Sequence, residues 1–121
     1  MELPAGDYIG MHRDEIDTPV LLVDLDALDY NIEKMAAHFC KAGKHLRPHS
    51  KSHKTPAIAH LQLNAGALGI TCAKLGEAEV MANAGIRDIL IANEVVGPRK
   101  IERLMHLATR CDIMVAVDHP A

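Results

Sequence analysis

The sequence predicts an α/β protein: the N-terminal half of a (β/α)8 barrel of the TIM type, with parallel strands alternating with helices. Short continuous apolar runs, which are typical of strands buried on both faces, alternate with amphipathic segments at helical spacing. The tripeptide Asn-Ala-Gly occurs at 64–66 and again at 83–85, each time between a predicted helix and a strand, so one β/α unit is repeated.

Four such units are half of an eight-stranded barrel, which typically needs about 250 residues. The chain has 121 residues, enough for one domain with a real core. A complete doubly wound sheet of four strands is the alternative architecture, and it would be small for that class. We expect an irregular leader over residues 1–17 and one partial barrel domain over residues 18–121.

The elements follow in order along the chain. Val20-Leu21-Leu22-Val23 has the composition of a short strand, and Asp26 can cap the helix that follows it. One apolar stripe on that helix is expected to be buried; it consists of Leu28, Ile32, Met35, Ala36 and Phe39. Thr55-Pro56 is a strong helix start, because it combines a capping hydroxyl with proline at the first helical position.

Four parallel strands are expected at about 45–48, 68–72, 89–92 and 112–117. The first is the weakest, because Leu46 is its only apolar residue. Helices are expected at about 26–41, 55–65, 75–84 and 98–109. Strands that are parallel and joined through helices require right-handed crossovers.

The composition limits the function classes. Hydrophobic residues make up 49% of the chain and aromatic residues 2%, so the core is expected to be small and aliphatic. A net charge of −3 and the scarcity of aromatic platforms argue against nucleic acid as a partner. No apolar run approaches the length of a membrane span, so no membrane partner is expected. The start at Met1 does not resemble a signal peptide, and three widely spaced cysteines do not form a disulfide framework, which together favour the cytoplasm.

Polar residues follow each predicted strand, where a β/α barrel places its active site. They are His49 to Lys54, Thr71 to Lys74, Asn93 and Glu94, and Asp118 and His119. Polar loops after strands are also the default in proteins without a site there. The pattern therefore indicates where chemistry is expected without showing that it occurs.

The run Arg47-Pro48-His49-Ser50-Lys51-Ser52-His53-Lys54 is the densest of these segments. Its mixture of cations and ring nitrogens suits a site that holds an anionic cofactor and a reactive amine. Schiff-base chemistry needs a neutral amine, which cationic neighbours such as Arg47 and Lys54 favour. Spacing alone does not select Lys51 over Lys74, and a solvated loop lysine is the alternative interpretation.

Histidines recur every four residues at His45, His49 and His53, which on a helix would suggest a metal-binding face. Pro48 makes a helix through this run improbable. We therefore predict no metal site from these histidines.

The basic run closely resembles the Arg-Pro-His-x-Lys-x-His-Lys signature of D-threonine aldolases and the related D-serine and 3-hydroxyaspartate dehydratases. Segments 18–26, 71–78 and 88–97 resemble further parts of that family, so the likeness extends over about residues 16–118 in order and spacing. The resemblance implies an alanine-racemase-type barrel that uses pyridoxal 5′-phosphate, with Lys51 as the catalytic residue that forms the Schiff base. The cofactor-binding residues are then expected to be Lys51, His49, Thr71 and Asn93.

The implied activity is that of a lyase on D-β-hydroxy amino acids. Aldolases of this family break the Cα–Cβ bond, whereas dehydratases remove the α-proton and expel the β-hydroxyl. A divalent metal commonly assists in the full-length enzymes, and its ligands lie outside this chain. Family members are about three times longer and place the segment at 20–23 with a second domain, outside the barrel sheet. A homodimer is one expectation for the full-length protein. The alternatives are an amino-acid racemase, a non-catalytic carrier of the cofactor, or an inactive truncated fragment.

Overall fold

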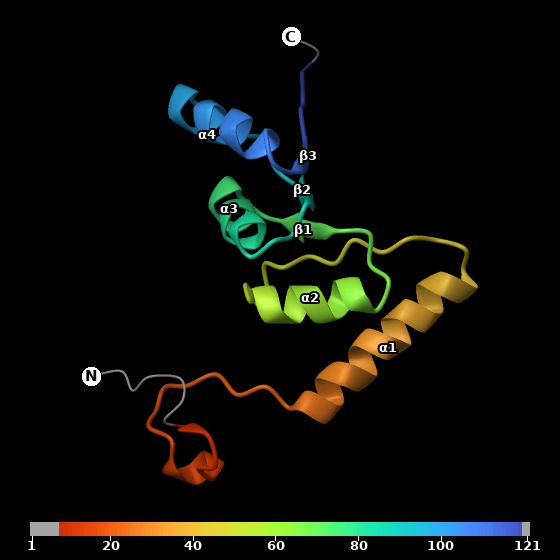
Figure 1. Ribbon diagram of the computed structural model, residues 1–121, viewed down its shortest axis with the longest axis vertical. Coiled ribbons are helices and arrows are strands. Elements are labelled where there is room, and N and C mark those ends of the chain that lie inside the picture. Colours follow the sequence, from red (N-terminus) through yellow and green to blue (C-terminus); the bar gives the residue numbers. More distant parts are fainter. Residues whose placement is uncertain (1–7, 120–121) are drawn as a thin grey trace.

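A sheet of three parallel strands organises the computed structural model, which describes residues 8–119 (Figure 1). The strands are β1 (Ile70–Cys72), β2 (Asp88–Ile91) and β3 (Asp112–Val115). Their order in the sheet is β1-β2-β3, the same as along the chain. The neighbours pair in parallel, with Ile70 opposite Ile89 and Ile89 opposite Ile113, which confirms the predicted strand direction.

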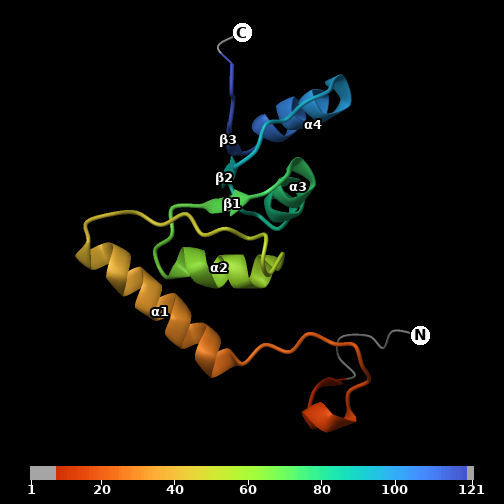
Figure 2. The same ribbon diagram turned by 180° about the vertical axis from the view of Figure 1, so that it is seen from behind.

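Helices precede and follow these strands. They are α1 (Leu25–Lys41), α2 (Pro56–Asn64), α3 (Leu75–Asn83) and α4 (Pro98–Ala108), with a short 3-10 helix at Arg13–Glu15. The four α-helices begin and end within a residue or so of their predicted bounds. Figures 1 and 2 show α3 and α4 on the same side of the strands. Doubly wound sheets carry helices on both faces, so this one-sided arrangement is that of a barrel segment.

The core lies between the strands and α3. It is aliphatic, as the composition predicted, and its largest fully buried members are Ile70, Met81, Ile86, Ile89, Ile91, Leu107 and Cys72. The repeated Asn-Ala-Gly ends α2 and α3 in the same way, because Gly66 and Gly85 both have a positive φ, of 103° and 93°. The left-handed glycine turns the chain from each helix into the next strand.

The prediction of a fourth strand at 45–48 is wrong. This segment runs beside β1 but forms a single parallel bridge, between His49 and Thr71. The Thr71 N–H donates to the Pro48 carbonyl at 2.7 Å, and the Ser50 N–H donates to the Thr71 carbonyl at 2.8 Å. A longer parallel ladder would need the N–H of residue 48 to donate to the carbonyl of Gly69, and proline has none.

Two expectations for the N-terminal part are also corrected. The segment at 20–23 is exposed and forms no strand, although it does lie outside the sheet as predicted. Asp24, not Asp26, caps α1, because its carboxylate accepts the Ala27 N–H at 2.9 Å. The extended chain therefore ends two residues earlier than the pattern suggested.

The apolar stripe of α1 is not buried, contrary to prediction. No residue of α1 is buried, and Met35 has 48% of its surface exposed. The stripe instead faces an apolar cavity of about 860 Å³ between α1, the segment at 43–49 and the end of α2. An amphipathic helix needs a partner for its apolar side. In the described part of the chain, the apolar side of α1 faces this cavity where a packing partner would lie.

An ion pair lies at the amino ends of the strands, opposite the predicted site. The Arg47 guanidinium donates to the Asp88 carboxylate, and both side chains are partly buried. The two residues come from the segment beside β1 and from the start of β2. The pair crosses close to Gly69, where an added Cβ would lie 2.3 Å from Arg47 Nη1 and 2.3 Å from the Asp88 carbonyl oxygen. Only glycine leaves room for it.

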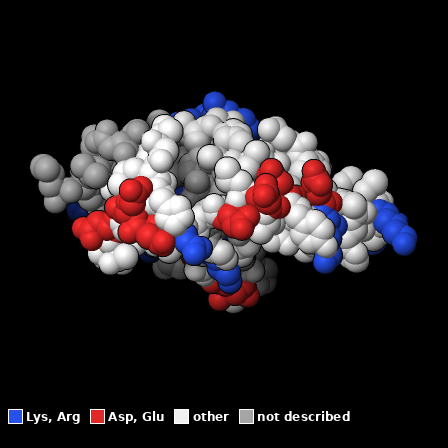
Figure 3. All heavy atoms as spheres, turned by 90° about the horizontal axis from the view of Figure 1, so that it is seen from below, with Lys and Arg blue, Asp and Glu red and all other residues white. Residues whose placement is uncertain are grey.

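Charge on the face shown in Figure 3 is mixed, with acidic and basic side chains interspersed and no broad basic area. Among the described residues, no helix is both long enough and apolar enough to cross a bilayer.

We expect the isolated chain to self-associate. Within residues 8–119, β3 pairs with β2 alone, so its second edge offers free N–H and C=O groups. Apolar side chains of α1 and α4 add exposed surface, including Met105 at 61%. Sedimentation velocity should show a weight-average mass that rises with concentration. A concentration-independent monomer that unfolds cooperatively would contradict this expectation.

Candidate active site

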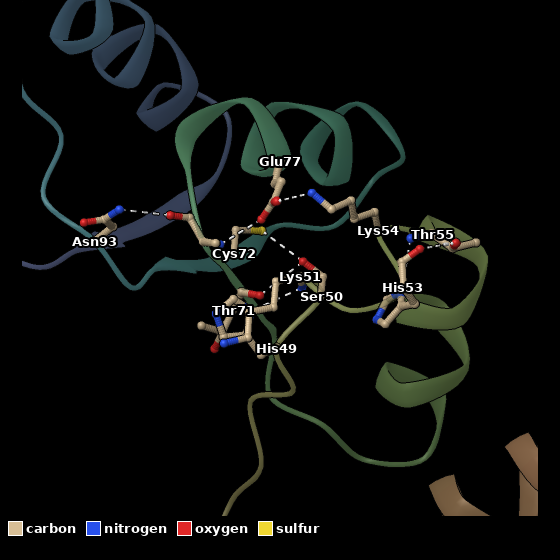
Figure 4. Close-up of polar contacts among 11 residues, drawn as sticks. His49, Ser50, Lys51, His53, Lys54, Thr55, Thr71, Cys72, Glu77 and Asn93 are labelled. Carbon is tan, nitrogen blue, oxygen red and sulfur yellow. Dashed lines mark hydrogen bonds and ion pairs between the residues drawn. The ribbon is translucent and has the colours of Figure 1, made fainter.

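The predicted site residues come from the carboxyl ends of neighbouring parallel strands, which share one edge of the sheet (Figure 4). His49 ends the segment beside β1 and is bridged to Thr71 of β1. Asn93 lies in the loop after β2. The structure thus brings His49, Lys51 and Thr71 together on adjacent segments, with Asn93 one strand further along.

Ser50 anchors the first end of the loop that carries Lys51. It is fully buried, and its N–H donates to the Thr71 carbonyl at 2.8 Å. Its hydroxyl donates to the same carbonyl at 3.1 Å and lies 3.5 Å from Cys72 Sγ. Lys51 follows immediately and is exposed, with its backbone N–H donating to His49 Nδ1 at 3.2 Å. The backbone before Lys51 is therefore fixed while its side chain is open to solvent.

Glu77 holds the second end of this loop. Lys54 has a positive φ of 51°, and its Nζ donates to Glu77 Oε1 at 2.9 Å. The other carboxylate oxygen of Glu77 accepts the Ala73 N–H at 2.8 Å. Burial of Glu77 would raise its pKa, but the hydrogen bonds from Lys54 and from the Ala73 N–H outweigh that effect and leave the pKa below its usual value.

Sequence reasoning did not identify Glu77 as part of the site. One signal was available: Glu77 is the third residue of α3, the position from which a glutamate reaches back over the helix start in a capping box. Glu77 and Lys54 are 23 positions apart, so their pairing could be recognised only from the tertiary structure.

The polar groups of Thr71 and Asn93 are already engaged. The Thr71 hydroxyl donates to the Arg47 carbonyl at 3.1 Å, which holds the segment at 47–49 against β1. The Asn93 amide donates to the Ala73 carbonyl at 3.4 Å and accepts the Glu94 N–H at 3.0 Å. Both residues thus shape the edge of the sheet, and their role in cofactor binding stays a prediction.

The two cations expected to act on Lys51 are each paired with a carboxylate. Arg47 is bound to Asp88 and Lys54 to Glu77. Within residues 8–119, no hydrogen bond or ion pair engages the ammonium of Lys51 or of Lys74. In the same range, no three side chains of histidine, cysteine, aspartate or glutamate gather as a metal site.

His53 is a titratable ring of the lysine loop whose environment shifts its pKa. Its Nδ1 accepts the Thr55 N–H at 3.0 Å, so the neutral ring carries its proton on Nε2. Burial lowers the pKa of His53 from its ordinary value. The folded state therefore favours the neutral ring.

Stability is consequently expected to fall on mild acidification. The contribution of neutral His53 is fully present above the unfolded-state pKa of about 6.5 and is lost as the pH falls through the lower folded-state pKa. Urea unfolding between pH 7.5 and pH 5 should show a smaller pH effect for His53→Asn, whose amide oxygen can still accept the Thr55 N–H. The control is His119→Asn, at an exposed position after β3. An unchanged slope in His53→Asn would contradict the assignment.

Parallel strands with helices on one side, and an exposed lysine at their carboxyl edge, define part of a β/α barrel whose site lies at that edge. Residues 23–121 match the family described as alanine racemase, N-terminal domain. The chain belongs to this family.

The individual relatives are aldolases and dehydratases. The chain is 47% identical over 117 residues to a D-threonine aldolase of Arthrobacter sp., which covers 97% of this chain and 31% of that protein. It is 44% identical over 111 residues to the 3-hydroxy-D-aspartate aldolase of Paracoccus denitrificans, covering 90% and 29%. The chain thus spans less than a third of the length of these relatives.

Solved structures agree in fold. The crystal structure of D-threonine aldolase from Filomicrobium marinum matches with a TM-score of 0.83 at 52% identity, over 85% of this chain and 28% of that one. D-threo-3-hydroxyaspartate dehydratase from Delftia sp. matches with a TM-score of 0.79 at 39% identity, over 86% and 27%. The predicted barrel of the alanine racemase type is confirmed.

Proposed function

We propose that the chain is the N-terminal portion of a pyridoxal-phosphate-dependent lyase that acts on D-β-hydroxy amino acids, and that Lys51 carries the cofactor. The observation that supports this most is the loop at 49–54. Its backbone is fixed at both ends by Ser50 and Lys54, while the Lys51 side chain is exposed at the edge where barrels hold their ligands. The aldolase and dehydratase relatives favour a lyase over a racemase.

The residues at this edge suit the cofactor. Lys51 offers a primary amine that forms no hydrogen bond or ion pair with any described residue. Attachment of an aldehyde requires such an amine. Pyridoxal phosphate, when bound, supplies an electron sink that weakens the bonds to the α-carbon of an amino acid. His49 accepts the Lys51 backbone N–H at Nδ1, which leaves Nε2 to hold or move a proton at this edge of the sheet.

Other parts of the proposal concern the longer enzyme. We propose that the remaining cofactor contacts, and the ligands of a divalent metal that binds the substrate hydroxyl, lie in the part of the relatives that this chain does not span. A homodimer and a cytoplasmic location belong to the same proposal.

Covalent trapping tests the lysine assignment. The chain is incubated with pyridoxal 5′-phosphate, reduced with borohydride and digested, and the pyridoxyl group is mapped by mass spectrometry. Lys51 should carry most of the label. A label centred on Lys74, or spread evenly over the exposed lysines, would refute the assignment.

A further inference from the structure

We infer that Glu77 and Lys54 are positioning residues for Lys51: their ion pair fastens the lysine loop to α3 and so sets where the reactive amine lies. This inference rests on the proposed function of Lys51 and goes beyond it, because it assigns a role to a buried carboxylate and to the second lysine of the basic run.

The first argument is that the two ends of the loop are held in different ways. Ser50 is fixed to β1 through its backbone N–H and its hydroxyl. At the other end, the Lys54 N–H donates at 2.7 Å to the Ser50 carbonyl, which closes the loop on itself without attaching it to another element. Among the hydrogen bonds of the described residues, the contact between Lys54 Nζ and Glu77 is the one that joins residues 51–55 to α3.

The backbone of Lys54 supports the same interpretation. Its φ of 51° lies in the left-handed region, which non-glycine residues rarely adopt and which costs free energy. This conformation closes the turn and places the side chain against Glu77 (Figure 4). An interaction that holds the side chain there offsets part of that cost.

The second argument is that Glu77 joins two loops. One oxygen binds Lys54 from the lysine loop, and the other accepts the Ala73 N–H from the loop after β1. Only 8% of the Glu77 surface is exposed, so a carboxylate at this place needs both donors. The carboxylate therefore sets the spacing between the loop of Lys51 and the loop that begins after Cys72.

The third argument concerns the choice between lysines. The Lys54 ammonium is engaged by a carboxylate, whereas Lys51 has no such partner among the described residues. Glu77 thus directs the chemistry to Lys51 in two ways, by fixing the loop and by engaging the competing amine.

The test measures the rate at which Lys51 acquires the pyridoxyl group, using pyridoxal 5′-phosphate and borohydride on the 121-residue chain. Lys100, on α4, is the internal reference within each digest. Glu77→Gln and Lys54→Met should each slow labelling of Lys51 relative to Lys100 by roughly tenfold. Glu77→Gln should also raise the label on Lys54, because its amine is released.

Two further variants separate positioning from a general loss of charge. Glu79→Gln removes a carboxylate two residues further along α3, which pairs with Arg103 of α4 and not with the lysine loop; it should leave the labelling unchanged. Lys54→Arg keeps a cation opposite Glu77 and should restore the rate that Lys54→Met loses. Rescue by arginine distinguishes positioning from a structural effect of any substitution at this site.

The outcomes are distinct. If wild-type label is not on Lys51, the proposed function fails and the inference fails with it. If wild-type label is on Lys51 but Glu77→Gln and Lys54→Met label at the wild-type rate, the inference alone is overturned. Circular dichroism checks the fold of each variant. If Glu77→Gln does not fold, Lys54→Met decides, because the Lys54 side chain is 60% exposed and is not part of the apolar core.

Discussion

Replacing Lys51 with methionine is expected to abolish covalent binding of pyridoxal phosphate at the loop and, in the longer enzyme, all turnover. Methionine is unbranched and of similar length, so it preserves the contacts of the aliphatic stem while removing the amine. Because the proposed attachment is to the amine of Lys51 alone, the loss should be complete. The readouts are the near-visible absorbance of the bound cofactor and pyridoxyl incorporation after borohydride reduction.

Lys74→Met is the matched control. Lys74 follows β1 at the same edge of the sheet and also has no ion-pair partner within the described residues. Its replacement should leave both signals in place. Retention of the absorbance in Lys51→Met, or its loss in Lys74→Met alone, would contradict the assignment to Lys51 and favour Lys74 as the attachment site.

Gly69→Ala is expected to produce the largest loss of stability of any glycine-to-alanine substitution in the described part of the chain. Its Cβ would lie 2.3 Å from the Asp88 carbonyl oxygen, and backbone at that position cannot move away without disturbing β2. It would also displace Arg47 from its pair with Asp88. Overpacking of this kind costs about 3 kcal/mol, with a further cost for the partly buried charges of Arg47 and Asp88 left without partners.

Gly76→Ala provides the comparison. Gly76 lies in the first turn of α3, and a Cβ there would meet no atom within 4 Å. Alanine should stabilise the helix by up to about 1 kcal/mol. Chemical denaturation of both variants measures the difference in free energy of unfolding. Equal stabilities for Gly69→Ala and the wild type would contradict the close packing of Arg47 and Asp88 around Gly69.

Local pattern was sufficient to predict most of the fold. The runs around Ile70, Ile89 and Ile113 have the apolar composition that is typical of parallel strands, and each forms a strand. Pro56 and Pro98 marked helix starts correctly, and Gly66 and Gly85 marked helix ends. These signals act within a few residues, so a single sequence contains them.

What could not be predicted depends on contacts between distant segments. Arg47 and Asp88 are 41 positions apart, and neither residue type indicates the other. In the sequence, Glu77 is an ordinary glutamate in the first turn of a helix, and only the fold places Lys54 next to it. The strand expected at 45–48 did not form, because Pro48 lacks the N–H that a longer ladder with β1 needs. Residue type and strand order thus predicted the edge of the sheet at which the candidate site lies. They did not predict the hydrogen bonds and ion pairs within that site.

The order of the strands has a consequence for how the chain reaches its fold. Each strand pairs with one that lies roughly twenty positions away in the chain, so every ladder closes a short loop. Short loops lose little entropy on closure, and folds built from local contacts form quickly. The sheet can therefore lengthen one strand at a time, in chain order from the lysine loop to β3.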